Sequence, residues 1–129
     1  MSVSGKPRAV TTERKKKPAL EAWKDTVRKA TAGESRMTGL CQVHVDFVLP
    51  RGSYRTANRQ MPYGSDVDNL AAAVLDALKE YVVPEPAGDG AVMELLATKR
   101  EAGEGEEPGV LIVVIDLAPS DAMLSNSRM

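Results

Sequence analysis

The stretch SDVDNLAAAVLDAL, residues 65–78, places two carboxylates one residue apart at the start of an apolar, helix-forming run. We predict that residues 65–68 are extended, so that the alternate side chains of Asp66 and Asp68 point to the same side of the chain. A helix then begins at about Asn69, and its free backbone N–H groups and positive dipole end lie beside the two acids. The helical spacing predicts a buried face made of Leu70, Ala71, Val74, Leu75 and Leu78.

The acid pair has two interpretations on the residues alone. In the first, Ser65, Asp66 or Asp68 caps the helix, because a side-chain oxygen at this position accepts a backbone N–H. One acid is enough for a cap, however, and two like charges held close together repel each other unless a cation lies between them. Hard divalent ions such as Mg²⁺ prefer oxygen ligands, so the second acid favours a metal site.

Four short motifs follow one another in the second half of the chain. They are Asp-x-Asp-Asn-Leu at 66–70, Asp-Ala-Leu at 76–78, Gly-Asp-Gly at 88–90, and a strand that ends at Lys99. This order resembles the RusA family of small Holliday-junction resolvases, also known as crossover junction endodeoxyribonucleases. The resemblance is good over about residues 40–117 and loose before them.

The resemblance implies an acid triad, because Asp66, Asp68 and Asp89 fall on the three metal-binding catalytic aspartates of the family. It also implies Mg²⁺ as the cofactor, with Mn²⁺ able to replace it. Lys99 is the weaker match, and we expect it to neutralise charge on the phosphate. One position departs from the family, which usually carries a lysine where this chain has Ala72.

The remaining pattern predicts a mixed α+β domain with two main helices and a small antiparallel or mixed sheet. A helix over residues 18–32 is indicated by Leu20, Trp23, Val27 and Ala30 at helical spacing, and Trp23 is expected in the core. Strict alternation predicts a strand over residues 41–49 with its odd positions buried. Further strands are expected over 91–100 and 110–117, joined by a charged hairpin loop.

Three segments divide the chain by composition. Residues 1–17 are polar and basic, and we expect a mostly flexible arm whose strand, if there is one, is short. Residues 18–118 form the expected RusA-like endonuclease domain. Residues 119–129 lack any period and are expected to be a frayed tail.

The net charge of −1 conceals a division between the halves of the chain. Residues 1–63 hold 13 Lys and Arg against 5 Asp and Glu, whereas residues 64–129 hold 4 against 13. A basic half can attract a polyanion, and an acidic half can hold cations, although solvated surface charge explains much of the same pattern. The expected DNA contacts are the cations of the first helix and of the loop after the first long strand: Lys24, Arg28, Arg51, Arg55 and Arg59.

Cysteine and histidine content excludes other site types. The single Cys41 excludes an internal disulfide framework and fits a reducing cytoplasm, and with the single His44 it cannot build a zinc site. We expect both residues to be structural. No run is long or apolar enough to cross a membrane, and the basic N-terminus lacks an apolar signal core.

The function expected from the residues and the resemblance together is a Mg²⁺-dependent, structure-selective endonuclease that cuts branched DNA, above all four-way junctions. We expect a homodimer, because resolving a junction requires cuts on two strands and a two-fold protein presents two sites. The alternative is a non-catalytic protein that keeps the fold and binds branched DNA, which Ala72 favours and the intact acids oppose.

Overall fold

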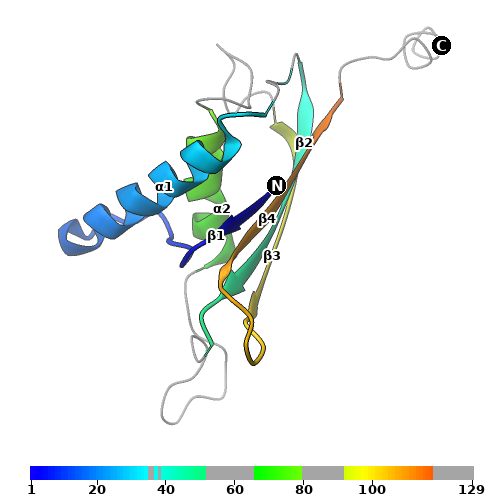
Figure 1. Ribbon diagram of the computed structural model, residues 1–129. Helices are drawn as coiled ribbons and strands as arrows, with labels where there is room; N and C mark the ends of the chain where they lie inside the picture. The colour runs from blue at the N-terminus through cyan, green and yellow to red at the C-terminus, as the bar shows by residue number, and fades with distance from the viewer. Residues whose placement is uncertain (35–36, 38, 52–65, 80–91, 118–129) are drawn as a thin grey trace, which may run out of the picture.

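The computed structural model describes residues 1–34, 37, 39–51, 66–79 and 92–117, which form two α-helices and a four-stranded sheet (Figure 1). Both helices lie on the same face of the sheet. The elements are, in chain order, β1 (Ser2–Ser4), the short 3₁₀ helix η1 (Arg14–Lys16), α1 (Lys17–Thr31), β2 (Cys41–Leu49), α2 (Val67–Leu78), β3 (Val92–Glu101) and β4 (Gly109–Asp116). The mixed α+β architecture expected from the sequence is therefore confirmed.

Strand β2 has the predicted bounds, and its alternation is confirmed by burial. Cys41, Val43, Val45, Phe47 and Leu49 are all buried, whereas the even positions are at least partly exposed. Successive side chains of a strand point to opposite faces, so the odd residues pack under the helices. Apolar residues of β-branched and aromatic type at these positions make this strand the centre of the core.

Helix α2 covers β2 with a face of small and branched side chains. Leu70, Ala71, Val74 and Leu78 are buried as predicted, and Leu75 is half-buried. The helix begins at Val67, two residues earlier than the sequence pattern predicts. The reason is local, because Asp66 takes the extended N-cap conformation (φ −64°, ψ 141°) and the backbone N–H of Leu70 already donates to its carbonyl oxygen at 3.0 Å.

Helix α1 packs beside α2 through Leu20, Trp23 and Val27, which are buried as expected. Ala30 differs from the prediction because it is exposed, and Thr31 closes the buried face in its place. The buried Thr31 hydroxyl donates to the Val27 carbonyl oxygen at 2.9 Å, so it is not left without a partner.

The order of strands in the sheet is β1-β4-β2-β3, which corrects part of the prediction. β3 is a strand, as predicted, but it pairs parallel to β2, and β4 pairs antiparallel to β2 on the other side. The loop 102–108 is therefore not a hairpin between neighbours, since β2 lies between the two strands that it joins. A parallel pair needs a crossover connection, and α2 supplies it between β2 and β3. The ends of β2 and β3 and the start of α2 thus lie together, at the lower end of the sheet in Figure 1.

Residues 1–17 are part of the folded domain, which corrects the expectation of a flexible arm. Ser2–Ser4 pair antiparallel with β4, with Ser2 opposite Leu111 and Ser4 opposite Gly109. Val3 and Pro7 are buried. Backbone pairing does not depend on side-chain polarity, so a polar, basic composition did not prevent a short strand. The predicted tail over residues 119–129 lies outside the described residues.

The face of the sheet opposite the helices exposes a group of large apolar side chains, which we call the open face. Within the described residues no helix covers it. Its members are 40–51% exposed and lie opposite even-numbered positions of β2: Leu96, Leu111, Val113 and Ile115. Leu96 and Val113 flank His44 in one cross-strand row. Exposed apolar patches of this kind are typical of interaction surfaces.

Candidate functional site

A hollow of about 680 Å³ lies at the lower end of the sheet, where β2 ends and α2 begins. Eleven residues from three segments line it: Lys6–Thr11 and Lys16 from the N-terminal segment, Leu49 and Pro50 from the end of β2, and Asp66 and Asn69 from the start of α2. The hollow therefore brings one of the predicted acids together with cations from the other end of the sequence. It is the candidate site among the described residues.

Asp66 borders this hollow and is exposed at the N-cap position of α2. Its side chain makes no capping hydrogen bond, although its backbone has the capping conformation. An aspartate at this position ordinarily accepts a backbone N–H of the first turn. The carboxylate of Asp66 is therefore not used to begin the helix, which removes the simplest structural explanation for this acid.

Asp68 lies in the first turn of α2 and is also exposed. Its Oδ1 accepts the backbone N–H of Asn69 at 3.0 Å. The predicted extended geometry, with both carboxylates on one side of a strand, is wrong because residues 67 and 68 are already helical. The two acids instead occupy the N-cap and the first turn of one helix, where its positive dipole end stabilises negative charge.

The third predicted acid, Asp89, lies outside the described residues, as do Arg55 and Arg59. Among the residues that are described, no three carboxylate, histidine or cysteine side chains come together as a metal site. Asp66 and Asp68 are thus the part of the predicted triad whose positions are known.

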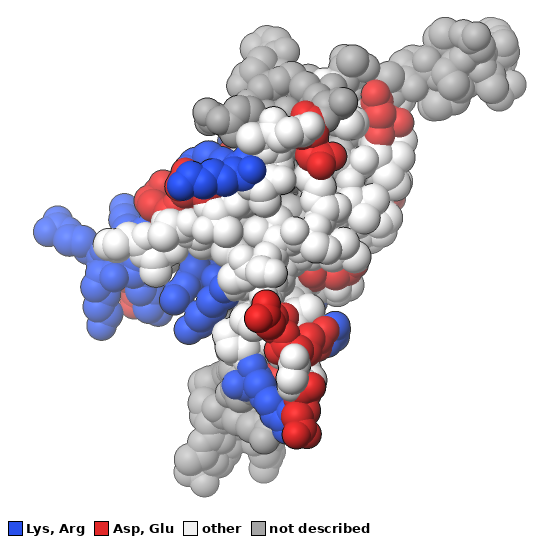
Figure 2. Space-filling view, viewed as in Figure 1, with Lys and Arg blue, Asp and Glu red and all other residues white. Residues whose placement is uncertain are grey.

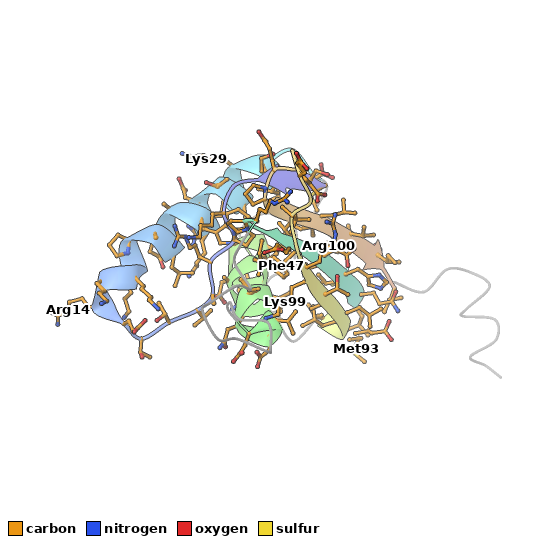
Figure 3. All side chains as sticks on the ribbon, turned by 90° about the horizontal axis from the view of Figure 1, so that it is seen from below. Arg14, Lys29, Phe47, Met93, Lys99 and Arg100 are labelled. Carbon is orange, nitrogen blue, oxygen red and sulfur yellow. The ribbon has the colours of Figure 1, made fainter. Side chains whose placement is uncertain are left out.

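Lys99 lies opposite Phe47 in the parallel register, so it is on the face of the sheet that the helices cover. Lys99 is half-buried, and Figure 3 shows it beside α2. It stands two residues before the end of β3, at the same end of the sheet as Asp66. The next residue, Arg100, points to the other face and forms a bidentate pair with Glu106 at 2.7 and 2.6 Å. Lys99, not Arg100, is therefore the strand-end cation on the site's face.

The other predicted DNA contacts are divided between two places. Arg51 is exposed in the turn directly after β2, close in sequence to Pro50 of the hollow. Arg28 is half-exposed on α1. The Lys24 side chain is only 14% exposed, and its Nζ lies 3.3 Å from Glu21 and 3.6 Å from Asp76 of α2. Lys24 thus links the two helices, a role that the sequence pattern did not indicate.

Sequence reasoning missed the contribution of the N-terminal segment to the site. Its basic composition was evident, but no periodicity in residues 1–17 indicated where the chain would run. In the structure the backbone N–H of Val10 donates to the carbonyl oxygen of Asn69 at 3.1 Å, so the segment is joined to the first turn of α2. Lys6 and Arg8 reach the hollow as a result.

Figure 2 shows how charge is distributed on one face of the molecule. Lysine and arginine side chains gather along α1 and the adjoining N-terminal segment, and most of the acidic side chains in view lie over the sheet and its loop. The division between basic and acidic halves of the sequence is therefore also a division in space. A polyanion would approach from the helical side, which is the side of the hollow.

Cys41 is buried in the core, and His44 is half-buried on the other face of the sheet. The pKa of the Cys41 thiol is raised mainly by burial and to a smaller extent by the negative charge of Asp116. The thiol therefore stays protonated and unreactive. Nε2 of His44 is shielded from solvent and has no hydrogen-bond partner within the described residues. No helix in the described part of the chain is long and apolar enough to span a membrane.

The comparisons with known proteins identify one relationship. The family model described as endodeoxyribonuclease RusA matches residues 2–115 of the 129. No match was found among curated proteins or among solved structures. The matched range begins at the first residue of β1 and ends one residue before the end of β4, so it spans the whole fold except Asp116.

Proposed function

Because the chain belongs to the RusA family of endodeoxyribonucleases, we propose that it is a Mg²⁺-dependent nuclease that resolves Holliday junctions or other branched DNA. Membership of the family implies Holliday-junction-resolving nuclease activity.

One observation carries the assignment of the acids. Asp66 is at the N-cap of α2, borders the hollow, and makes no capping hydrogen bond with its side chain. A carboxylate that is exposed beside a hollow and unused by its own helix is suited to bind a cation. Asp68, in the first turn of the same helix, keeps one oxygen on the Asn69 N–H at 3.0 Å and is exposed, so its other oxygen is open to a cation. We assign both as metal ligands, with Asp89 as the third.

The donor chemistry of these residues fits Mg²⁺, which takes oxygen ligands and commonly one or two carboxylates with water and phosphate oxygens. When bound, the ion would lower the pKa of a water and stabilise charge on the leaving oxygen. The protein residues hold the ion and orient the DNA strand. Lys99, on the covered face of the sheet beside α2, neutralises charge on the scissile phosphate.

DNA contacts away from the reacting phosphate come from the loop that follows β2. Arg51 is exposed at the start of this loop, and we assign Arg55 and Arg59 to the same role, with Arg28 as a contact farther along α1. Contacts to phosphates from these cations carry no sequence information, but they set the register of the strand over the acids. Lys24 is the weakest of the proposed contacts because it is already paired with Asp76.

We also propose that the protein is a homodimer that pairs through its open face. Leu96, Leu111, Val113 and Ile115 form an apolar surface on the side opposite the site, and a second copy would cover it. Two-fold pairing of one such surface with itself leaves both hollows open to DNA. A four-way junction needs two cuts, so two sites in one particle suit the reaction.

The test uses Asp66→Asn, Asp68→Asn and Asp89→Asn beside the parent protein. Asparagine retains the shape and the capping ability of aspartate but removes the charge of a metal ligand. We expect each variant to bind a synthetic four-way junction in Ca²⁺ and to lose cutting in Mg²⁺ by at least about a hundredfold, the range expected when electrostatic stabilisation of a transition state is removed. An aspartate whose variant cuts at the parent rate is not a ligand.

The second candidate function, a branched-DNA-binding protein without catalysis, is favoured by Ala72 in α2. The same assay separates the two functions, since a parent protein that binds junctions but cuts neither junctions, flaps nor forks with Mg²⁺ or Mn²⁺ is the binding protein. If the parent cuts, Lys99→Ala should slow cutting more than it weakens binding, and adding Ala72→Lys should restore part of the rate. Equal loss of rate and affinity in Lys99→Ala would assign this lysine to binding alone.

A further inference from the structure

The N-terminal segment from Lys6 to Thr11 runs along the mouth of the hollow in a fixed position. Its start is held by the backbone N–H of Gly5, which donates to the Pro108 carbonyl oxygen at 3.1 Å, and by the buried Pro7. Its far end is held by the Val10 N–H on the Asn69 carbonyl oxygen at 3.1 Å. Backbone contacts therefore place this segment, and its charged side chains are not needed to hold it there.

Two of the cations that line the hollow have no acidic partner in the described residues. The ion pairs of the described chain include neither Lys6 nor Arg8. Lys16, the third cation of the lining, pairs with Glu13 at 2.6 Å and is compensated. Two cations that have no acidic partner in the described part of the chain, held by backbone contacts in a hollow, are suited to bind an anion. Among the described residues that line the hollow, the only acid is Asp66, which a metal ion would neutralise in the proposed function.

The volume of the hollow is large enough for a short stretch of DNA backbone. A hollow of about 680 Å³ is within the range of roughly 300–1,000 Å³ typical of sites that enclose a small organic ligand, which accommodates a nucleotide unit. The Asn69 residue beside Asp66 adds a neutral hydrogen-bonding side chain to the lining. Guanidinium and ammonium groups supply the charge-assisted hydrogen bonds that phosphate oxygens accept.

We infer that residues 6–11 form one wall of the DNA-binding cleft, and that Lys6 and Arg8 contact the phosphates adjacent to the one held at Asp66. This inference rests on the proposed function and adds to it a pair of phosphate-binding residues from the far end of the sequence. Both side chains bind and position the strand, whereas the acids act on the scissile phosphate. Arg8 is half-exposed and beside the tethered Val10, so it is the better fixed of the two.

The experiment measures junction binding in Ca²⁺ by fluorescence anisotropy from 50 to 200 mM KCl, for the parent, for Lys6→Ala/Arg8→Ala and for a matched control. The control, Arg14→Ala/Lys15→Ala, removes one arginine and one lysine from exposed residues that do not line the hollow and form no ion pair within the described residues. Arg14 is labelled in Figure 3, beside the start of α1.

Each lost phosphate contact should reduce the slope of log affinity against log salt by about 0.9. The Lys6→Ala/Arg8→Ala variant should therefore lose about 1.8 from the slope, so that its deficit against the parent shrinks by about twelvefold between 50 and 200 mM salt. The control should keep the parent slope. If the double variant fails to fold, Arg8→Gln alone should lose about 0.9 and Arg8→Lys should lose almost nothing.

The outcomes separate this inference from the proposed function. A parent that binds and cuts junctions, together with a Lys6→Ala/Arg8→Ala slope equal to that of the control, overturns the inference and leaves the nuclease assignment intact. A parent that binds no branched DNA overturns both. If the salt dependence of binding becomes shallower in Lys6→Ala/Arg8→Ala but not in the control, the result supports residues 6–11 as one wall of the DNA-binding cleft.

Discussion

Replacing Leu96 by alanine is expected to weaken the proposed dimer without weakening the fold. Leu96 is 51% exposed on the open face, beside His44 and in one cross-strand row with Val113. Fully burying a leucine side chain contributes about 1.5–3 kcal/mol, so covering the exposed half contributes about 0.8–1.5 kcal/mol in each copy. Because a two-fold interface contains Leu96 from both copies, the lost free energy of association is about 1.5–3 kcal/mol per dimer. The dissociation constant should therefore rise by roughly 10- to 150-fold.

Sedimentation equilibrium over a range of protein concentrations measures this constant for the parent and for the variants. The matched control is Leu95→Ala, because Leu95 is the neighbouring residue of the same type and is 39% exposed, but its partner in the parallel register is Val43, so it is on the face of the sheet that carries the helices. Leu95→Ala should leave dimer affinity close to that of the parent, whereas Leu96→Ala should weaken the dimer. Neither substitution should change the free energy of unfolding by more than about 0.5 kcal/mol, because both residues are exposed.

Two results would refute this reasoning. A parent that is a strict monomer at micromolar concentrations, with and without junction DNA, would show that the open face has no second copy on it. Equal dimer affinities in Leu96→Ala and Leu95→Ala would show that the copies pair elsewhere, for example through the edge of the sheet.

Three further substitutions or measurements test the fold and its charges. Gly109→Ala would place a Cβ against the Val3 carbonyl oxygen, so we expect the free energy of unfolding in urea to fall by about 1–3 kcal/mol; an unchanged midpoint would contradict the pairing of β1 with β4. The pKa of Glu106 is lowered from 4.5 to about 2, and the largest cause is the hydrogen bond from Arg100. The Arg100–Glu106 pair therefore stabilises the fold fully above pH 4.5, and this stabilisation is lost as the pH falls through 2. The difference in melting temperature between the parent and Glu106→Gln should therefore be constant above pH 5 and shrink below it, and a pH-independent difference would exclude the pair as the cause. Cys41, whose pKa is raised by burial, should react with a thiol reagent only after unfolding, and rapid labelling of the native protein would contradict its burial.

Local patterns in the sequence predicted individual elements well. Strand β2 could be bounded to the residue, because nine residues alternate without a break and the side-chain period of a strand is two. The start of α2 was predicted two residues late because Val67 and Asp68 have no strong helix preference, and the hydrogen bond from Leu70 to Asp66 decided the boundary. The composition of β3 also suits a helix, and its pairing with β2 overrides that preference.

The order of the strands in the sheet and the path of the N-terminal segment could not be predicted from local patterns. Alternation indicates which face of a strand is buried but not which strand is its neighbour, so β3 and β4 were expected as a hairpin and lie on either side of β2. The acids at Asp66 and Asp68 were identified from their spacing and from the family resemblance. The cations Lys6 and Arg8 were missed, because backbone hydrogen bonds to Pro108 and Asn69 carry their segment to the hollow and no side-chain pattern encodes those bonds.

The pairing of β1 with β4 has a consequence for when the protein can first act. Ser2 lies opposite Leu111, so β1, which is synthesised first, cannot join the sheet until β4 has been synthesised. Contacts of such long sequence separation form late, because they close a loop of nearly the whole chain. At a synthesis rate of about 5–20 residues per second, the segment that follows β1 remains unplaced for several seconds after it is made. A nascent chain therefore carries Asp66 and Asp68 well before residues 6–11 reach them, and its hollow is completed only once β4 has been synthesised.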